Sequence, residues 1–443
     1  MKKLNFLATL FTLSLCSNAY STTINDSLRA AYQYNPDFLK TVANVEIQKE
    51  QSLSALSKFL PNISFQSQRS VSKDRNPATK NTLNRIDNTA VSNSYQLTQN
   101  LFNGGSDYAQ LMSSQTLITS KEYSSLDAQQ QVFLKVIQSH LNVIGYKQIV
   151  QEYQKNLTYL DKTLRAEQEK FDAGLTKMTD LATTKANLES GKAQLAKSIA
   201  QLEIEEANYK TLTGIDPIEL ESPDVTTEVQ DSVASLYAKA TQTNLALKAS
   251  KTAYDASEIM SKAAFSSFMP DITFQYQYSK SSNSNNRLSL SPYSKSRSAT
   301  ANINIPIFQG GVEYAQYRTA KLQASQSRLD YIATLANTES ISKQAWFQFN
   351  ASKIAFKAYQ EASKASKTAL EGMNEAYNEG LVSITDLLTT LKDDVNNNIN
   401  LINAQASLIV YYYQTRSVTG DLTAEALGLN DELKVADDSP SSD

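Results

Sequence analysis

The sequence contains very little cysteine, histidine, glycine or proline. Among 443 residues, Cys16 is the only cysteine and His140 the only histidine, and there are 12 glycines and 9 prolines. Disulfide scaffolds, Cys/His zinc sites and Cys- or His-dependent nucleophilic catalysis are therefore excluded or nearly so. The 42 lysines and arginines against 45 acidic residues leave no basic excess that would favour nucleic acid. The shortage of helix breakers predicts long uninterrupted elements.

The first residues have the pattern of a secretory leader. Lys2 and Lys3 precede an apolar run over 4–15, and small residues up to Ala19 suit a cleavage site. The run is shorter than the roughly 20 apolar residues that a spanning helix needs. Residues 1–19 are therefore predicted to be a signal peptide. Lipid attachment at Cys16 is disfavoured, because Leu15 stands where such sites need a small residue.

Four motifs occur twice, in the same order and at offsets of about 206 to 209 residues. The pairs are 59–66 with 268–275, 101–110 with 307–316, 171–181 with 377–387, and 212–214 with 418–420. This self-similarity indicates a tandem duplication. It predicts a first repeat over 20–214, a linker over 215–230, a second repeat over 231–420 and a mobile tail over 421–443.

Each repeat predicts a helix, two strands around a polar loop, and two long helices. The first helices are expected over 24–58 and 231–267, each ended by the next proline, and the loops over 73–90 and 280–297. A helix over 106–171 would be about 99 Å long, which no globular core needs. The returning helix carries leucines at intervals of seven from Leu181 to Leu202, a seam for packing helix on helix. An ordinary helical bundle would show the same stripe.

Alternation of apolar and polar residues is strict over 271–278 and 299–307 and weaker in the first repeat, where Arg69 and Gln99 interrupt it. It predicts four strands of about 9–11 residues, the length that crosses a bilayer when tilted. Ile303 is expected to face lipid and Asn302 a lumen. Any half-buried antiparallel sheet shows such alternation, but so does a membrane barrel. Four strands cannot close a barrel, so copies must associate, two giving eight strands and three giving twelve. Polar inner faces suit the aqueous lumen of a larger barrel, which favours the trimer.

The paired glycines are expected to mark sharp changes of chain direction. Gly104-Gly105 and Gly310-Gly311 resemble a phosphate loop only weakly, since no Gly-Lys-Ser/Thr follows them. They are assigned instead to the change from strand to helix, where glycine tolerates unusual dihedral angles. Gly174 and Gly380 are assigned to the turns at the tips of the helical hairpins. His140, next to the seam residue Leu141, is interpreted as packing rather than as a ligand.

Two of the motifs that are present in two copies point to a known family. Their first copies are Leu-Phe-Asn-Gly-Gly at 101–105 and Phe-Asp-Ala-Gly-Leu-x-x-x-Thr-Asp-Leu at 171–181. Both motifs resemble those of the TolC family of outer-membrane efflux and type I secretion proteins. The resemblance covers nearly the whole chain after the leader. It implies a mainly helical fold with a membrane β-barrel portion: long duplicated hairpins forming a tunnel in the periplasm, and four strands per chain completing a twelve-stranded barrel in a homotrimer. The implied partners are outer-membrane lipid, a periplasmic adaptor (membrane fusion) protein and an inner-membrane transporter of ABC, RND or MFS type.

The resemblance also implies a closed periplasmic tip. Tyr377 matches a tyrosine that bonds to the first motif's aspartate, here Asp180 with Thr179 beside it, and Asp386 matches a pore-ring aspartate. A second pore aspartate is replaced by Thr389, and a latch arginine by Val382, which predicts a weaker latch.

Two interpretations of the acidic residues near the tip stay open. Asp386 is either a pore ring or a helix cap. Asp393, on the same helical face seven residues later, is either a second ring or a surface charge.

The function that these features favour is a passive exit duct for drug efflux, type I protein secretion or both. A trimeric coiled-coil structural or adhesive surface protein is the main alternative, and it explains the heptads and leader but not the strands. A periplasmic adaptor would normally have one long hairpin. An enzyme is least favoured, because no metal set or cofactor motif accompanies the carboxylates, and no cofactor is expected.

Overall fold

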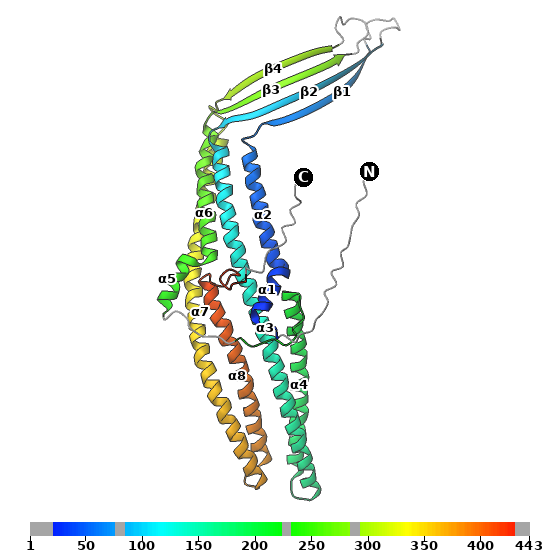
Figure 1. Ribbon diagram of the computed structural model, residues 1–443, viewed down its shortest axis with the longest axis vertical. Coiled ribbons are helices and arrows are strands. Elements are labelled where there is room, and N and C mark those ends of the chain that lie inside the picture. Colours follow the sequence, from blue (N-terminus) through cyan, green and yellow to red (C-terminus); the bar gives the residue numbers. More distant parts are fainter. Residues whose placement is uncertain (1–20, 76–84, 224–231, 284–292, 430–443) are drawn as a thin grey trace.

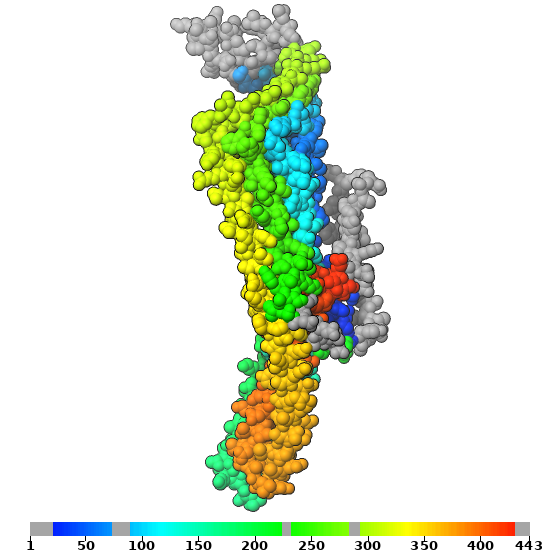
Figure 2. Space-filling view, turned by 90° about the vertical axis from the view of Figure 1, so that its left-hand side faces the viewer, coloured from blue at the N-terminus to red at the C-terminus, as the bar shows by residue number. Residues whose placement is uncertain are grey.

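Residues 21–75, 85–223, 232–283 and 293–429 are described by the structure, a computed structural model. The molecule is long and narrow, with a sheet at one end and the tips of two helical hairpins at the other (Figure 1). In the view turned by 90°, α7 and α8 cover most of the lower half (Figure 2). The predicted signal peptide and the closing residues of the predicted tail lie outside the described residues.

The two repeats contain matching elements in matching order. The first holds α1 (Ile24–Tyr34), α2 (Pro36–Ser57), β1 (Asn62–Arg75), β2 (Arg85–Asn103), α3 (Ser106–Asp172) and α4 (Met178–Thr213). The second holds α5 (Val233–Thr243), α6 (Leu245–Ala263), the 3₁₀ turn η1 (Ala264–Phe268), β3 (Asp271–Asn283), β4 (Tyr293–Asn304), α7 (Val312–Asn378) and α8 (Ile384–Val418). The mainly helical architecture with duplicated long hairpins and four strands is confirmed.

The long helices α3 and α7 have 67 residues each, about 100 Å at 1.5 Å per residue. Each returns as a helix of roughly half that length, α4 with 36 residues and α8 with 35. On the predicted seam of α4, Leu181 and Leu188 are buried and Leu195 and Leu202 are half-buried, and the small residue Gly191 beside them is buried as well. A Cβ at Gly191 would lie 3.1 Å from Leu160 Cδ1, so helix α3 packs closely there. None of the described helices has the length and apolar character needed to cross a membrane.

The first helix of each repeat is broken once, where the sequence predicted a single helix. Asn35 ends α1 and caps α2, its Oδ1 accepting from Phe38 N at 3.2 Å, and Asn244 caps α6 in the same way with Leu247 N at 2.9 Å. Each asparagine also donates from Nδ2 to a carbonyl near the end of the returning helix, Leu212 O or Val418 O. The two breaks therefore tie the short helices to the long hairpins.

The four strands form one antiparallel sheet in the order β1-β2-β3-β4, so β1 and β4 are its edges. The strands have 12 to 19 residues and are longer than the predicted 9–11. Their pairing continues past Val71 and Ser281, into the segments predicted to be loops. Ile303 lies opposite Ile272, and Asn302 lies opposite Thr273 on the other face. The apolar and polar sets thus occupy separate faces.

The paired glycines lie between a strand and the long helix that follows it. Gly105 and Gly311 precede α3 and α7 with φ of 83° and 87°, a left-handed conformation that suits glycine. A Cβ on Gly104 would lie 2.8 Å from the Ser266 carbonyl oxygen, so the close approach of η1 also requires glycine there.

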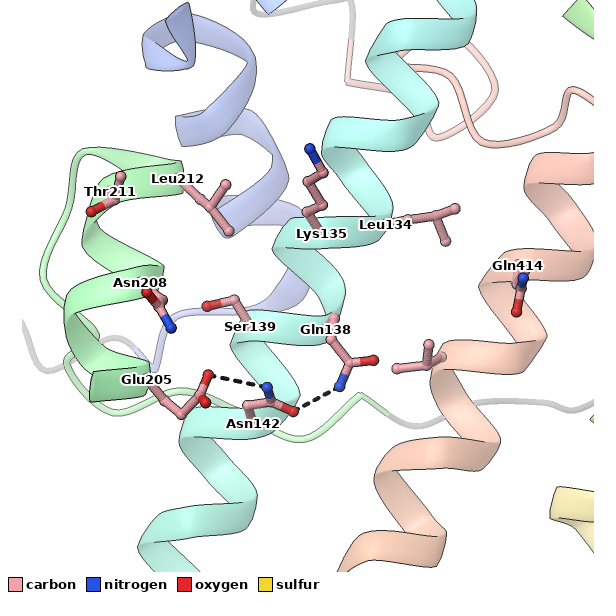
Figure 3. A pocket seen from close by; sticks show the side chains of 11 residues that line it. Leu134, Lys135, Gln138, Ser139, Asn142, Glu205, Asn208, Thr211, Leu212 and Gln414 are labelled. Atoms are coloured by element: carbon pink, nitrogen blue, oxygen red, sulfur yellow. Dashed lines mark hydrogen bonds between the residues drawn. The ribbon is translucent and has the colours of Figure 1, made fainter. Parts of the chain in front are cut away.

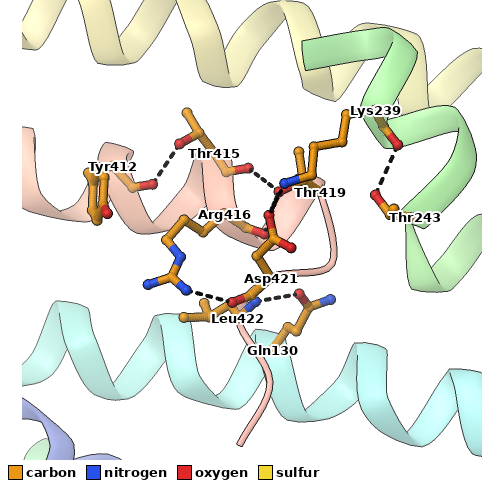
Figure 4. A network of polar contacts seen from close by, with 9 residues as sticks. All are labelled: Gln130, Lys239, Thr243, Tyr412, Thr415, Arg416, Thr419, Asp421 and Leu422. Atoms are coloured by element: carbon orange, nitrogen blue, oxygen red, sulfur yellow. Dashed lines mark hydrogen bonds and ion pairs between the residues drawn. The ribbon is translucent and has the colours of Figure 1, made fainter. Parts of the chain in front are cut away.

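The segment 421–429, predicted as the start of a mobile tail, is packed into the main core. Leu422 and Leu429 are buried, and Leu422 N donates to Gln130 Oε1 at 3.3 Å. Asp421 accepts from Lys239 Nζ at 2.5 Å and from Thr419 Oγ1 at 2.6 Å, so it links α5 to the end of α8 (Figure 4). The sequence did not indicate this packing, because the two core leucines stand in a stretch rich in acidic residues.

His140, on α3, is fully buried against α1, α4 and the chain after α4. Its Nδ1 lies 2.9 Å from Ser27 Oγ, and its Nε2 lies 2.9 Å from the Glu221 carbonyl oxygen. Tyr209 OH lies 2.7 Å from the same serine oxygen. Burial lowers the pKa of His140, although the bond to the Glu221 carbonyl opposes the change. The neutral ring therefore donates from Nε2 and joins the linker to the helices, in agreement with the packing role.

This burial predicts a loss of stability in mild acid. The native ring binds a proton less readily than the ring of the unfolded chain, so the contribution is complete above about pH 6.5 and declines as pH falls below that value. We expect the thermal unfolding midpoint of the detergent-solubilised protein to fall more between about pH 7.5 and 5.5 than that of His140→Gln. Equal pH dependence in both proteins would contradict this role.

Candidate functional site

The hairpin tips are built by two similar turns at the end of the molecule farthest from the sheet (Figure 1). Gly174 and Gly380 have φ of 74° and 76°, and each closes its long helix by donating to the carbonyl three residues earlier. The next amide, of Leu175 or Leu381, donates to the fifth carbonyl back at 2.8 or 2.9 Å. This Schellman-type ending reverses the chain within a few residues and places both tips side by side.

An apolar cluster joins the two hairpins just above their tips. Its buried members come from three helices: Leu160 on α3, Leu188 on α4, and Ile384, Leu387, Leu388, Leu391 and Val395 on α8. Tyr377 and Met373 on α7 pack against it. The hairpins therefore pack against each other through side chains in this single chain.

A buried carboxylate lies at the edge of this cluster. Glu167 on α3 is 1% exposed and accepts a hydrogen bond from the Tyr377 hydroxyl of α7. Lys170 Nζ lies 3.2 Å from Glu167 Oε1 and 2.8 Å from Tyr377 OH, and stands 4.1 Å from the centre of the tyrosine ring. Thr176 Oγ1, in the tip turn, donates to Glu167 Oε2 at 3.3 Å. We call Glu167, Lys170, Thr176 and Tyr377 the tip cluster.

Contacts within the tip cluster shift the pKa values of Tyr377 and Lys170, the two groups that both contact Glu167. Burial, and next the hydrogen bond to Glu167, raise the pKa of Tyr377. Burial opposes the charge of Lys170, but its bonds to Tyr377 and Glu167 leave its pKa above the usual value. At neutral pH the phenol stays protonated and the amine charged, so a buried carboxylate is compensated by a cation and two hydroxyl donors.

The expected bond between Tyr377 and Asp180 is not among the hydrogen bonds of the described residues. Tyr377 reaches Glu167 instead, because its ring lies over Lys170 and directs the hydroxyl toward α3. Asp180 accepts from Thr176 at 3.4 Å and from its neighbour Thr179 at 3.4 Å. Because Thr176 also faces Glu167, Asp180 belongs to the same tip through that threonine.

Asp386 forms a capping box at the start of α8. Ser383 Oγ lies 2.6 Å from Asp386 Oδ2, and the Asp386 amide lies 3.2 Å from Ser383 Oγ. The bonds from the Ser383 side chain and backbone lower the pKa of this exposed carboxylate. The cap interpretation is thus satisfied within one chain, whereas a ring would require further copies.

The next two aspartates of α8 differ in their surroundings. Asp393 is exposed, seven residues after Asp386 on the same face of the helix. Asp394 instead accepts from Ser366 at 2.8 Å, inside the α7/α8 hairpin. Asp393 is therefore the one of the pair that solvent, or another copy, can approach.

Sequence reasoning missed Glu167 and Lys170, because no duplicated motif includes them. One signal was present: Leu157, Leu160 and Leu164 set a spacing of three and four on α3, and the next position of that row is Glu167. A carboxylate in an apolar row needs a buried partner. That partner is supplied by α7, about 210 residues later in the chain.

A groove of about 550 Å³ lies where α3 and α4 diverge from α8 (Figure 3). Gln138 Nε2 donates to Asn142 Oδ1 at 2.7 Å, and Asn142 Nδ2 donates to Glu205 Oε2 at 3.1 Å. In the part of the chain that the structure describes, no group of three or more His, Cys, Asp or Glu residues could hold a metal ion. The groove is therefore a helix junction with a chain of hydrogen bonds from α3 to α4.

Comparisons with known proteins agree on one family. The family model described as "Outer membrane efflux protein" matches residues 28–215 and 236–420. The outer membrane efflux protein BepC of Brucella suis is 26% identical over 93% of this chain and 88% of its own length. The outer membrane protein TolC of Escherichia coli is 23% identical over 98% of this chain and 90% of its own length. The crystal structure of the CmeC outer membrane channel of Campylobacter jejuni superposes with a TM-score of 0.77 at 18% identity, covering 90% of this chain and 86% of that chain.

The tip cluster predicts that Glu167 holds the two hairpins together. Glu167→Gln removes the charged acceptor, and hydrogen bonds to charged groups contribute about 1.5–3 kcal/mol each. We expect amide hydrogens near 167–176 and 377–386 to exchange about ten- to a hundredfold faster, as hydrogen–deuterium exchange mass spectrometry would report.

Glu169→Gln is the matched control, because Glu169 is an exposed residue of the same helix turn. Unchanged protection in Glu167→Gln, or equal loss in both variants, would contradict the role of the buried carboxylate.

Proposed function

Because this chain belongs to the outer membrane efflux protein family, we propose that three copies assemble into one continuous duct that crosses the outer membrane and extends into the periplasm. Members of this family are outer-membrane channels that work with inner-membrane pumps and adaptors, and this chain is an outer-membrane efflux channel. In our proposal the duct is passive and serves drug efflux, type I protein secretion or both. Energy and substrate choice come from an ABC, RND or MFS transporter and a periplasmic adaptor.

The observation that carries this proposal is a sheet with two open edges and two chemically distinct faces. One face carries Ile63, Leu97, Tyr276 and Ala299 in one row across the strands. The other carries Ser64, Gln96, Gln277 and Ser298 in the neighbouring row. Unpaired backbone groups in hydrocarbon cost several kcal/mol each, so β1 and β4 must be covered by other copies. Twelve strands from three copies leave a lumen that water can fill.

The helices offer matching surfaces below those edges. Leu39, Val42, Leu53 and Leu56 form an exposed stripe on α2, on the β1 side of the molecule (Figure 1). Leu322, Leu329, Phe347 and Ile354 form an exposed stripe on α7, on the opposite side. If β4 of one copy pairs with β1 of the next copy, the α7 stripe of the first copy packs against the α2 stripe of the next. The sheet and the helices therefore join the copies in the same head-to-tail order. One rotation therefore closes both the sheet and the helical wall.

We infer that the tips form the regulated end of the duct. The tip cluster, with Asp180 and Thr179 beside it, holds the hairpins together within each copy. Asp386 and Asp393 would then meet their equivalents around the threefold axis as charged rings. The capping box uses one carboxylate oxygen of Asp386, and the exposed position leaves the group accessible from the axis.

The proposal assigns no catalytic step to this chain. Asp386 caps α8, Glu167 belongs to the tip cluster, and Glu205 in the groove of Figure 3 accepts a hydrogen bond from Asn142. A wide lumen discriminates little between solutes, so the transported substrate is chosen before entry.

Single-channel recording in a lipid bilayer tests the duct directly. Ile303→Arg should hinder membrane assembly by about 2–4 kcal/mol at mid-depth, while Asn302→Arg should assemble and lower cation conductance. The two residues are neighbours on β4 and lie on opposite faces, so each is the control for the other. A wild-type protein that inserts without conducting, or two variants that assemble and conduct alike, would overturn the proposal.

The same recordings decide the role of Asp386. Asp386→Ala should reduce cation selectivity and block by multivalent cations added at the tip side, because a carboxylate ring concentrates cations. Loss of a cap alone would leave selectivity and block unchanged.

A further inference from the structure

One face of the sheet carries a compact group of basic residues beyond its apolar region. By register, Arg69, Lys280, Lys295 and Arg297 share the face of Ile63 and Phe65. All four are exposed. The opposite face, in the same described rows, carries Ser, Gln, Thr, Asn and Ala instead of lysine or arginine. We call these four residues the basic rim.

The basic rim begins at an aromatic row: Arg297 lies in this row, and Lys280 and Lys295 lie in the next row on the same face. Phe65, Tyr95 and Tyr278 form consecutive ring contacts, with centres 4.8 and 6.4 Å apart. Going from Ile272 to Tyr278 along β3 covers about 20 Å of apolar and aromatic surface at 3.4 Å per residue. Such rows mark the boundary between hydrocarbon and headgroups. The rim therefore begins where the headgroups begin, at the end of the sheet away from the helices.

The rim places like charges directly opposite one another. Lys280 pairs with Lys295 across β3 and β4, where directly opposed side chains have Cβ atoms about 5 Å apart and like charges destabilise the sheet. Aromatic rings keep two of the cations at this level: Arg297 stands 5.6 Å from the Tyr278 ring, and Lys280 stands 5.9 Å from the Tyr293 ring. The only carboxylate among the described side chains of the strands, Asp271, lies at the helix end and accepts from Asn304. Among the described side chains of the strands, no carboxylate therefore shares the face and rows of the rim.

We propose that the basic rim binds the phosphate groups of anionic lipids in the outer leaflet, a phosphorylated glycolipid layer. The inference rests on the proposed function, which turns this face toward lipid. Lysines and arginines just beyond an apolar band meet the headgroup phosphates of the lipids that the band contacts. Lys280 and Lys295, held side by side, suit phosphates that lie close together. Binding there fixes the depth of the sheet in the membrane.

Lipid binding by the intact, detergent-purified protein tests the proposal. The probes are a bis-phosphorylated glucosamine-disaccharide lipid, the same lipid without phosphates, and inorganic phosphate, with bound lipid counted by native mass spectrometry. Lys280→Gln/Lys295→Gln should bind the phosphorylated lipid roughly thirty-fold more weakly than wild type, at about fivefold per charge. The unphosphorylated lipid should bind both proteins equally, and millimolar phosphate should not compete.

Lys121→Gln/Lys197→Gln is the matched control, since it removes two exposed charges from the helices α3 and α4 and leaves the strands unchanged. It should bind like wild type. Equal loss in the control, indifference to lipid phosphorylation, or displacement by free phosphate would overturn the rim as a lipid site. Conductance of the same preparations is measured separately. A rim variant that conducts normally shows an intact duct, whether or not it has lost lipid binding.

Discussion

The open edges of the four-stranded sheet are the constraint on which the rest of the architecture depends. A strand edge has backbone donors and acceptors that hydrocarbon cannot satisfy, so a sheet in a membrane must close. This chain supplies four strands with β1 and β4 unpaired by its own sequence. In the proposed assembly, closure through identical copies also brings the exposed stripes of α2 and α7 together. The sheet and the helical wall are then two consequences of one rotation, and the duplication within the chain doubles the number of hairpins around the axis.

The two ends of the molecule carry opposite kinds of charge cluster: a buried carboxylate at the tip and exposed cations on the sheet. At the tip, a buried carboxylate is matched by Lys170 and by hydroxyls of Tyr377 and Thr176, so the charge stabilises a contact between hairpins. At the far end of the sheet, the cations of the basic rim have aromatic neighbours and face outward. The tip cluster is complete within a single chain, whereas the partner that we propose for the basic rim is an external anion. In the proposed duct, the tip cluster belongs to the closable end in the periplasm and the basic rim fixes the depth in the membrane.

The sequence predicted the periodic parts of the fold and missed the parts that depend on single contacts. Heptads, alternation and duplicated motifs reveal long helices, strands and tip glycines, because each repeats a local rule. The break at Asn35 could also have been predicted, since asparagine before proline is a strong helix start. It was not predicted because the residues on both sides favour one continuous helix. Leu422 and Glu167 were not assigned, because their partners, Gln130 and Tyr377, lie more than 200 residues away. The Tyr377 contact in particular is decided by the angle at which two hairpins meet.

Disulfide formation between strand edges tests the central claim most directly. The leader holds the only cysteine, so Gln66→Cys on β1 combined with Ser296→Cys on β4 gives a defined pair, with β4 positions 294, 298 and 300 covering other registers. Within one chain these edges are three strand spacings, about 14 Å, apart, beyond the roughly 7 Å limit of a disulfide. Oxidation in membranes should therefore give covalent species that end at three chains on non-reducing gels. Products that remain monomeric at every register, or end at two chains, would contradict the closed trimeric barrel.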